Sequence, residues 1–216
     1  MNENSSKQVL LSVLGIAVLV VAVVGVSFAF FTYSKTGEKN NTLTTGNIFF
    51  NFTEGNAITL TNEFPRTDTS GEALTESQNG ALTFHVVGYD SSEKGIEYTV
   101  YALQGDADDT KTRFKDSEIK LNLKAPATVV ENKFATSNVV GIDGSLANGV
   151  ILAKGKITAK SSATQQDDEY TLRMWISDAV TIGEGKSYTT AEYAKMYYSL
   201  KLKVVAATTG TTQPGV

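Results

Sequence analysis

The sequence predicts an all-β protein: a two-sheet β-sandwich of jelly-roll type, preceded by an N-terminal apolar helix. Beyond residue 40 the chain consists of short runs rich in β-branched and aromatic residues, separated by Gly, Asn, Asp and Ser. This pattern is typical of an all-β domain. Several runs alternate polar and apolar residues, so each strand has one buried and one solvated face. Such strands fit two sheets packed face to face, whereas parallel α/β sheets have continuous apolar strands separated by long helices.

The N-terminal feature is an almost unbroken apolar run at residues 9–31. As a helix it spans about 34 Å at ~1.5 Å per residue, enough to cross a hydrocarbon core roughly 30 Å thick. Its end reads Ser27-Phe28-Ala29, with small residues at the third and first positions before a possible cut, as signal peptidases require. Two interpretations stay open: a signal peptide cleaved between Ala29 and Phe30, or a retained membrane anchor. Both place the rest of the chain outside the cytoplasm.

The expected domain organisation follows from this run. Residues 1–29 are a signal peptide or transmembrane helix, residues 30–207 one β-sandwich domain, and residues 208–216 a flexible tail. Strands are expected at residues 42–52, 57–61, 81–88, 96–103, 118–124, 150–160, 169–177 and 197–206. A helix of one or two turns is expected after Thr189 or Thr190, since either can act as its N-cap. Loops are expected at residues 62–80, 105–115 and 161–168.

Composition argues against several classes of function. The chain has 23 acidic and 19 basic residues, a net charge of −4 and no basic stripe, so nucleic-acid binding is not expected. It has no cysteine, which excludes disulfides, thiol catalysis and cysteine-ligated metals. A cysteine-free exported protein is more typical of a Gram-positive bacterial surface than of a eukaryotic secretory route. No glycine-rich phosphate loop is present, and no cofactor is expected.

Few residues offer catalytic chemistry. His85 is the only histidine, so no His-Glu-x-x-His motif exists, and we interpret His85 as a packed or rim residue. The acidic loop with Asp106, Asp108 and Asp109 lacks EF-hand spacing and is interpreted as a solvated turn, as is the run at 167–169. Six aromatic residues are interpreted as cross-strand packing rather than as a sugar-binding face: Tyr98, Tyr101, Tyr170, Trp175, Tyr197 and Tyr198. We therefore expect no catalytic residues, no metal ligands and no enzymatic activity.

The junction between the apolar run and the β-patterned body carries a more specific pattern. Residues 26–34 read VSFAFFTYS and residues 41–48 read NTLTTGNI. Together they resemble the start of the TasA/camelysin family, exported proteins of Gram-positive bacteria that a dedicated SipW-type signal peptidase processes. In that family a small-residue cut site and an aromatic block precede a Thr-x-Gly-x-hydrophobic first strand. The resemblance is strong over residues 25–52 and diffuse beyond them.

The resemblance implies a jelly-roll subunit of extracellular biofilm-matrix fibres. Family fibres grow when the freed N-terminal segment of one subunit adds as a strand to the next, a form of β-augmentation. Carried over to this chain, the signal peptidase site comprises Ser27, Ala29 and Phe30. The donor strand comprises Phe30, Phe31, Thr32, Tyr33, Ser34, Lys35 and Thr36. The expected partners are the SipW-type signal peptidase, further copies of the chain, and the membrane through residues 9–31 before or without cleavage.

Two alternatives remain. If the apolar run is retained, the body is a membrane-anchored surface binding module or adhesin at the cell surface. Camelysin-like proteins have also been classed as metallopeptidases, so the resemblance itself raises an enzymatic function. A single histidine argues against that function, because metallopeptidase sites normally use more than one.

Overall fold

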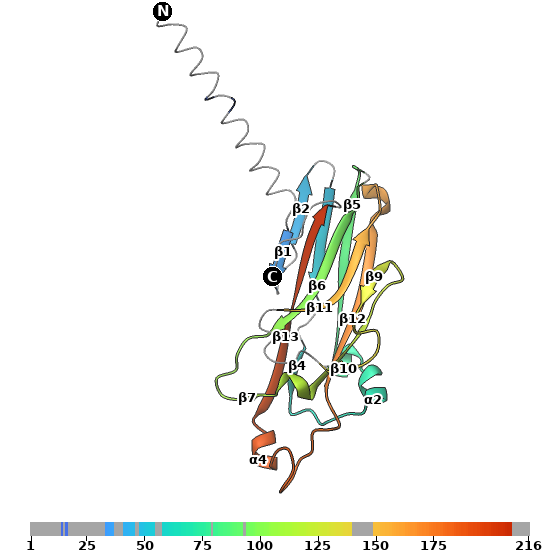
Figure 1. The fold of residues 1–216 in the computed structure, drawn as a ribbon. Coiled ribbons are helices and arrows are strands. Elements are labelled where there is room, and N and C mark those ends of the chain that lie inside the picture. The colour runs from blue at the N-terminus through green and yellow to red at the C-terminus, as the bar shows by residue number, and fades with distance from the viewer. Residues whose placement is uncertain are drawn as a thin grey trace, which may run out of the picture.

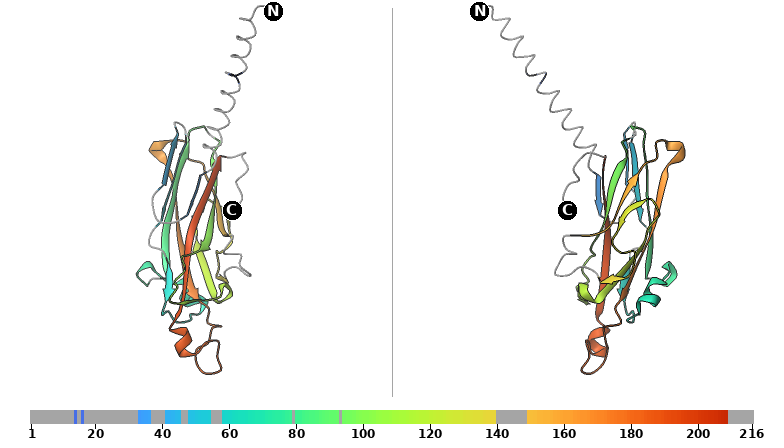
Figure 2. Two further views of the ribbon diagram at one scale, coloured as in Figure 1. Left: turned by 90° about the vertical axis from the view of Figure 1, so that its left-hand side faces the viewer. Right: turned by 45° about the vertical axis from the view of Figure 1, so that its right-hand side comes forward.

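The fold is a β-sandwich of two sheets packed face to face (Figures 1 and 2). A computed structural model of the chain describes Leu14, Ile16 and residues 33–36, 41–45, 48–54, 58–78, 80–92, 94–139 and 149–208. The strands pair antiparallel, except for one parallel pair between β7 and β13. The predicted all-β, two-sheet architecture is therefore confirmed.

The first sheet has seven strands, in the order β1-β13-β6-β11-β9, and β4 and β7 also pair with β13. Their bounds are β1 (Tyr33–Thr36), β4 (Thr59–Thr61), β6 (Ile96–Gln104), β7 (Thr112–Arg113), β9 (Val129–Asn132), β11 (Val150–Ile157) and β13 (Met196–Thr208). The second sheet has six strands in the order β10-β8-β12-β5-β3-β2. Their bounds are β2 (Asn41–Thr45), β3 (Ile48–Glu54), β5 (Ala81–Asp90), β8 (Ile119–Lys124), β10 (Asn138–Val139) and β12 (Gln166–Ile176).

Short helices lie in the connections. They are α2 (Asp68–Glu72), α4 (Thr190–Tyr193) and the 3₁₀ turns η1 (Glu76–Gln78), η2 (Asp116–Glu118) and η3 (Ser162–Thr164). The expected helix after Thr189 or Thr190 is α4, and Thr189 is its N-cap. The Thr189 hydroxyl accepts the Glu192 N–H, while the Glu192 carboxylate accepts the Thr189 N–H at 2.8 Å. This reciprocal pair is a capping box.

The core lies between the sheets and follows the strand alternation. In β5, Leu82, Phe84 and Val86 are buried, while the residues between them are only half-buried. Phe84 stacks on Tyr170 of the neighbouring strand β12, with ring centroids 4.8 Å apart. The core also joins the two sheets, because Phe50 of β3 contacts Tyr98 of β6 at 6.1 Å between ring centroids. The period-two pattern of the sequence thus decides which face of each strand is buried.

Several expected elements differ from the structure. The strand expected at 42–52 is a hairpin of β2 and β3, with Thr45 paired to Ile48. The sequence between these strands is Gly46-Asn47, a dipeptide that favours a two-residue turn. The loop expected at 62–80 contains α2 and η1. The loop expected at 161–168 ends earlier, because β12 begins at Gln166; the solvated-turn interpretation of residues 167–169 is therefore wrong.

The N-terminal predictions lie almost entirely outside the described residues. Of the apolar run at 9–31, Leu14 and Ile16 are described; both are helical and exposed. Ser27, Ala29 and Phe30 of the expected cleavage site lie outside the described residues, as does the tail beyond Thr208. No helix in the described part of the chain is long and apolar enough to cross a membrane.

Candidate functional site

The expected donor segment contributes the first strand of the seven-stranded sheet. Tyr33, Ser34, Lys35 and Thr36 form β1, which pairs antiparallel with β13 from Tyr33 opposite Ala206 to Thr36 opposite Lys203. Phe30, Phe31 and Thr32, the other expected donor residues, lie outside the described residues. The described part of the donor segment is thus docked on its own chain (Figure 1).

The receiving strand, β13, has a different neighbour on each side. One side pairs with β6 from Leu200 to Thr208 and continues into β7. On this side, the N–H groups of Gly105 and Phe114 donate hydrogen bonds to the carbonyls of Ser199 and Tyr197, at 3.0 and 2.9 Å. The other side carries two separate short strands, β4 and β1. Within the described ranges, no strand fills the edge of β13 between these two.

Near the C-terminal end of β13, β1 pairs on one side and β6 on the other, and β1 is held more weakly than β6. β1 has four residues, lies at one end of the strand order and packs chiefly on β13. Its other edge has no strand partner among the residues that the structure describes. A short terminal strand with one neighbour detaches from a sheet more readily than an internal strand, because it breaks only one ladder.

His85 lies on the outer face of the six-stranded sheet, between two carboxylates. Its Nδ1 is 2.8 Å from Oδ1 of Asp167, and its Nε2 is 4.0 Å from Oε2 of Glu169. Glu169 stands directly opposite His85 on β12. All three side chains are partly exposed, which agrees with a rim histidine. The described residues contain no group of three or more His, Cys, Asp or Glu side chains that could hold a metal ion.

The acidic loop after β6 uses its carboxylates locally. Asp108 accepts the Thr110 N–H at 3.0 Å and lies 3.4 Å from the Lys111 ammonium. Hydrogen bonds from Thr110 lower the pKa of Asp108 below its ordinary value, with a smaller contribution from Lys111. Asp106 pairs with Lys201 of β13. The turn interpretation of this loop therefore agrees with its geometry.

The six aromatic residues considered for a sugar-binding face are all buried, with at most 7% of the surface of any one exposed. Tyr98, Tyr170 and Tyr198 lie in the core between the sheets. The packing interpretation is therefore confirmed, and these rings do not form an exposed platform.

A buried polar cluster was missed by the sequence interpretation. Asp168 is only 1% exposed. Its carboxylate accepts hydrogen bonds from the Tyr98 hydroxyl, the Thr128 hydroxyl at 2.6 Å and the Gln166 amide at 3.0 Å. The Tyr170 hydroxyl lies 2.7 Å from that of Tyr98. The alternation of β12 could have revealed this cluster. Asp168 is separated by even numbers of residues from Tyr170, Leu172 and Met174, which are buried, so its side chain lies on the same face of the strand.

The two tyrosines of this cluster stay protonated. Burial raises the pKa of Tyr98 and of Tyr170 above the ordinary value, and the negative charge of Asp168 raises both further. Protonated hydroxyls can donate, so the cluster satisfies a buried carboxylate with neutral groups. It joins β6 of one sheet to β12 of the other, which is a structural role.

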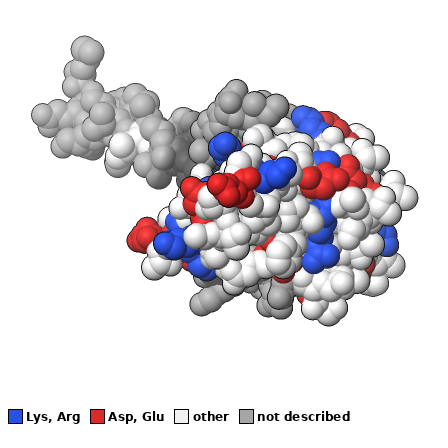
Figure 3. All heavy atoms as spheres, turned by 90° about the horizontal axis from the view of Figure 1, so that it is seen from below, with Lys and Arg blue, Asp and Glu red and all other residues white. Residues whose placement is uncertain are grey.

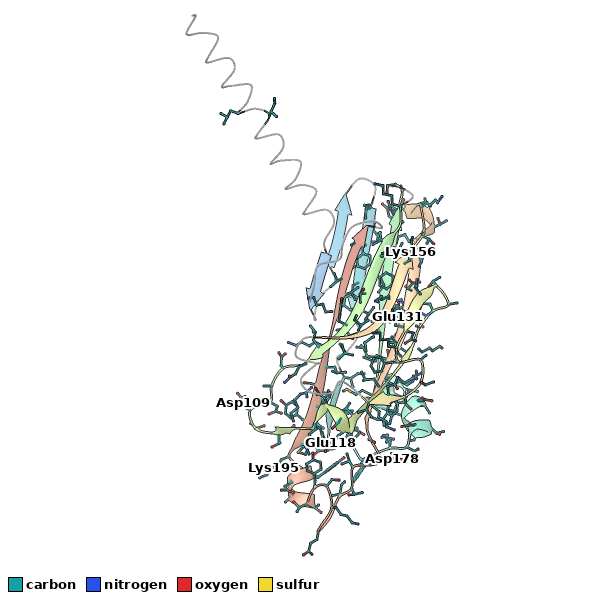
Figure 4. All side chains as sticks on the ribbon, in the orientation of Figure 1. Asp109, Glu118, Glu131, Lys156, Asp178 and Lys195 are labelled. Atoms are coloured by element: carbon teal, nitrogen blue, oxygen red, sulfur yellow. The ribbon has the colours of Figure 1, made fainter. Side chains whose placement is uncertain are left out.

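One shallow groove of about 260 Å³ crosses β6, β11 and β9. It is lined by Glu97, Tyr98, Thr99, Val130, Lys154, Gly155 and Lys156. Val130 is 76% exposed, and Lys154 pairs with Glu131 at 2.9 Å. Figure 4 labels Glu131 on β9 and Lys156 on the neighbouring strand β11. The lining of the groove carries charges of both signs and no histidine.

Charge is also mixed at the end of the molecule that bears α4. Seen from below, basic and acidic side chains alternate over the described surface, with no extended field of one sign (Figure 3). Such a surface does not steer partners of one charge strongly.

No protein-family model matches the chain, and no curated protein or solved structure is significantly similar to it. Membership of the TasA/camelysin family thus stays a prediction from residues 26–34 and 41–48. A functional assignment has to rest on the chain's own residues, foremost among them β1 and the edge of β13 on which it lies.

Proposed function

We propose that this protein is an exported structural subunit of extracellular biofilm-matrix fibres or of the cell surface. It assembles by adding its N-terminal strand to the next subunit, as the resemblance to the TasA/camelysin family implies. The observation that carries this proposal is the position of β1 at the end of its sheet, where β13 is its only strand partner in the described part of the chain.

Processing at the N-terminus prepares this assembly. The apolar run at residues 9–31 directs export, and a SipW-type signal peptidase cuts between Ala29 and Phe30. The cut converts a membrane tether into a free segment at residues 30–36. The body is a β-sandwich of jelly-roll type, which presents an edge to an added strand.

Strand addition suits this edge for a physical reason. An added strand gains main-chain hydrogen bonds along β13, and its alternate side chains lie on the two faces of the acceptor sheet. Val204 and Ala206 of β13 are buried, as is Val205 between them. A strand at this edge therefore borders apolar surface on the acceptor and stabilises it by burial as well as by hydrogen bonding.

Electron microscopy of the chain shortened to residues 30–216 tests the proposal. We expect ordered filaments from residues 30–216 and none from residues 37–216, which lack the donor strand. A matched pair is Lys35→Pro, which removes a ladder N–H from β1 because Lys35 stands opposite Val204, and Lys35→Ala, which keeps it. Thermal unfolding of each variant checks that its body is folded.

Two results would count against the proposal: filaments from residues 37–216, or monomers only from residues 30–216 over a wide range of pH and salt. N-terminal sequencing of the exported protein adds a separate check, because processing as proposed leaves Phe30 as the first residue. An intact Met1 in the membrane fraction would argue against release.

The second candidate function is a membrane-anchored binding module. The groove over β6, β11 and β9 favours it, because exposed Val130 and half-buried Lys156 offer one apolar and one basic contact. It predicts an uncut chain that stays monomeric and binds a surface ligand. A metallopeptidase function would instead require cleavage of a protein substrate that a chelator abolishes.

A further inference from the structure

We infer that the free subunit rests in a self-capped state, in which its own β1 covers the acceptor edge of β13. Assembly then exchanges this strand for the identical strand of a second copy. This inference rests on the proposed function and adds to it the acceptor, the register and the step that holds assembly back.

The acceptor is the edge of β13 that faces β1. β1 covers positions Lys203–Ala206 of β13, whose opposite side is already paired with β6. If β1 leaves, the backbone N–H and C=O groups of this edge lose their partners next to the buried side chains of Val204 and Val205. Unpaired backbone groups beside apolar surface are unfavourable. The vacated edge therefore favours a replacement strand of the same shape.

A short connection follows β1. β1 ends at Thr36 in the seven-stranded sheet, and β2 begins at Asn41 in the six-stranded sheet. The five backbone steps between them reach at most about 17 Å, while packed sheets lie ~10 Å apart. The connection is thus long enough to cross between the sheets. Once β1 detaches, it can extend away from the body while β2 keeps its place in the hairpin with β3.

Strand exchange leaves the pairing of β13 unchanged. A β1 from another copy makes the same pairs with β13, from Tyr33 opposite Ala206 to Thr36 opposite Lys203. Because the contacts broken and formed are identical, exchange is driven mainly by protein concentration rather than by a stronger contact. Each copy donates one strand and receives one, which is a head-to-tail contact that grows into an open filament. The detachment of β1 is the barrier, so assembly is expected to show a lag.

The chain has no cysteine, so a disulfide can lock β1 in place. Ser34 and Val205 stand directly opposite each other in the register. Opposed Cα atoms in an antiparallel ladder lie about 4.5–5.5 Å apart, within the range that a disulfide spans. We would make Ser34→Cys with Val205→Cys in residues 30–216 and oxidise the pair in dilute solution, so that the bond forms within one chain.

The oxidised variant should remain monomeric, and reduction should restore filaments at the rate of the unsubstituted chain. A matched control is Lys124→Cys with Thr171→Cys, which links β8 to β12 in the other sheet and leaves β1 free. The control should assemble whether oxidised or reduced. Equal melting temperatures of the two reduced variants would show that both bodies are folded.

The outcomes separate the inference from the proposed function. If the oxidised Ser34–Val205 variant assembles as fast as its reduced form, self-capping is overturned while the fibre function stands. If the unsubstituted chain and the reduced variants all fail to form filaments, the proposed function fails and self-capping falls with it. If the oxidised variant alone is arrested, both are supported.

Discussion

The hydroxyl of Tyr98, on β6, donates a hydrogen bond to the carboxylate of Asp168, on β12, and so ties the two sheets together inside the core. Both residues are almost fully buried. The carboxylate also accepts from Thr128 and Gln166, so its partners in the described part of the chain are neutral donors. A fully satisfied polar cluster of this kind favours one relative placement of the sheets over others.

Removing the Tyr98 hydroxyl tests this tie. Tyr98→Phe should lower the free energy of unfolding by about 1.5–3 kcal/mol, because the buried carboxylate loses a donor. Urea denaturation measures the change. The matched control is Tyr89→Phe, since Tyr89 is half-buried and stacks on Phe49; it should change stability by less than about 0.5 kcal/mol. Equal effects of the two substitutions would show that the hydroxyl of Tyr98 has no special role.

Gly155 leaves the space in which the Tyr98 ring lies. A Cβ atom at this position would stand 2.2 Å from Cζ of Tyr98 and 2.3 Å from its hydroxyl oxygen. Gly155→Ala should therefore cost roughly 1–3 kcal/mol of stability through overpacking. In a Tyr98→Leu background the same change should cost much less, because the clashing atoms are gone. Strictly additive costs in the double variant would rule out the steric explanation.

The ion pair between Lys120 and Asp68 predicts a pH dependence. Lys120 Nζ lies 2.6 Å from Oδ1 of Asp68, and this hydrogen bond is the largest cause that lowers the pKa of Asp68 below 3.8. Because the pKa is lower in the folded state, the pair stabilises the fold above about pH 4 and ceases to do so as pH falls through the folded-state pKa. Asp68 is 44% exposed, so the contribution is at most about 1 kcal/mol.

Lys120→Met should therefore lower the melting temperature at pH 7 and have a smaller effect at pH 2. Lys124→Met is the control, because Lys124 is exposed on the same strand. Thermal unfolding between pH 2 and pH 7 measures both. A difference between Lys120→Met and the unsubstituted protein that does not change with pH would contradict the assignment.

The capping box of α4 predicts a local effect. Thr189→Ala should lower the local stability of this helix by about 1 kcal/mol, since it removes the side-chain acceptor for the Glu192 N–H. Hydrogen exchange should then speed up at the N–H groups of Tyr193 and Ala194, which bond back into this turn. Thr190→Ala is the control and should leave their exchange almost unchanged. Equal acceleration by both substitutions would argue against a cap at Thr189.

Alternation in the sequence predicted the long strands well. The pattern of β8, with Ile119, Leu121 and Leu123 buried, is visible in the residues themselves. Strands of two to four residues, such as β1, β9 and β10, are too short to show alternation, and their pairing depends on distant strands. The sequence pattern predicted a turn at Asp168, because short charge runs such as residues 167–169 usually lie in loops. Its place in the core depends on Tyr98, 70 residues away in the chain.

The candidate site was only partly predictable for the same reason. The resemblance at the junction singled out residues 30–36 as a strand, but nothing near them in the sequence indicates β13 as their partner. The pairing of Tyr33 with Ala206 joins the two ends of the body. A register between such distant segments is decided by the packing of the whole sandwich, which single-sequence patterns do not encode.

The most direct measurement asks whether β1 of one copy pairs with β13 of another. Subunits with Ser34→Cys and subunits with Val205→Cys, both shortened to residues 30–216, are mixed in equal amounts, assembled and then oxidised. Each has a single cysteine, so a Ser34–Val205 disulfide can form only between two chains. We predict dimers that join one subunit of each kind, identified by mass spectrometry. Ordered filaments without this mixed disulfide would contradict the exchange of β1.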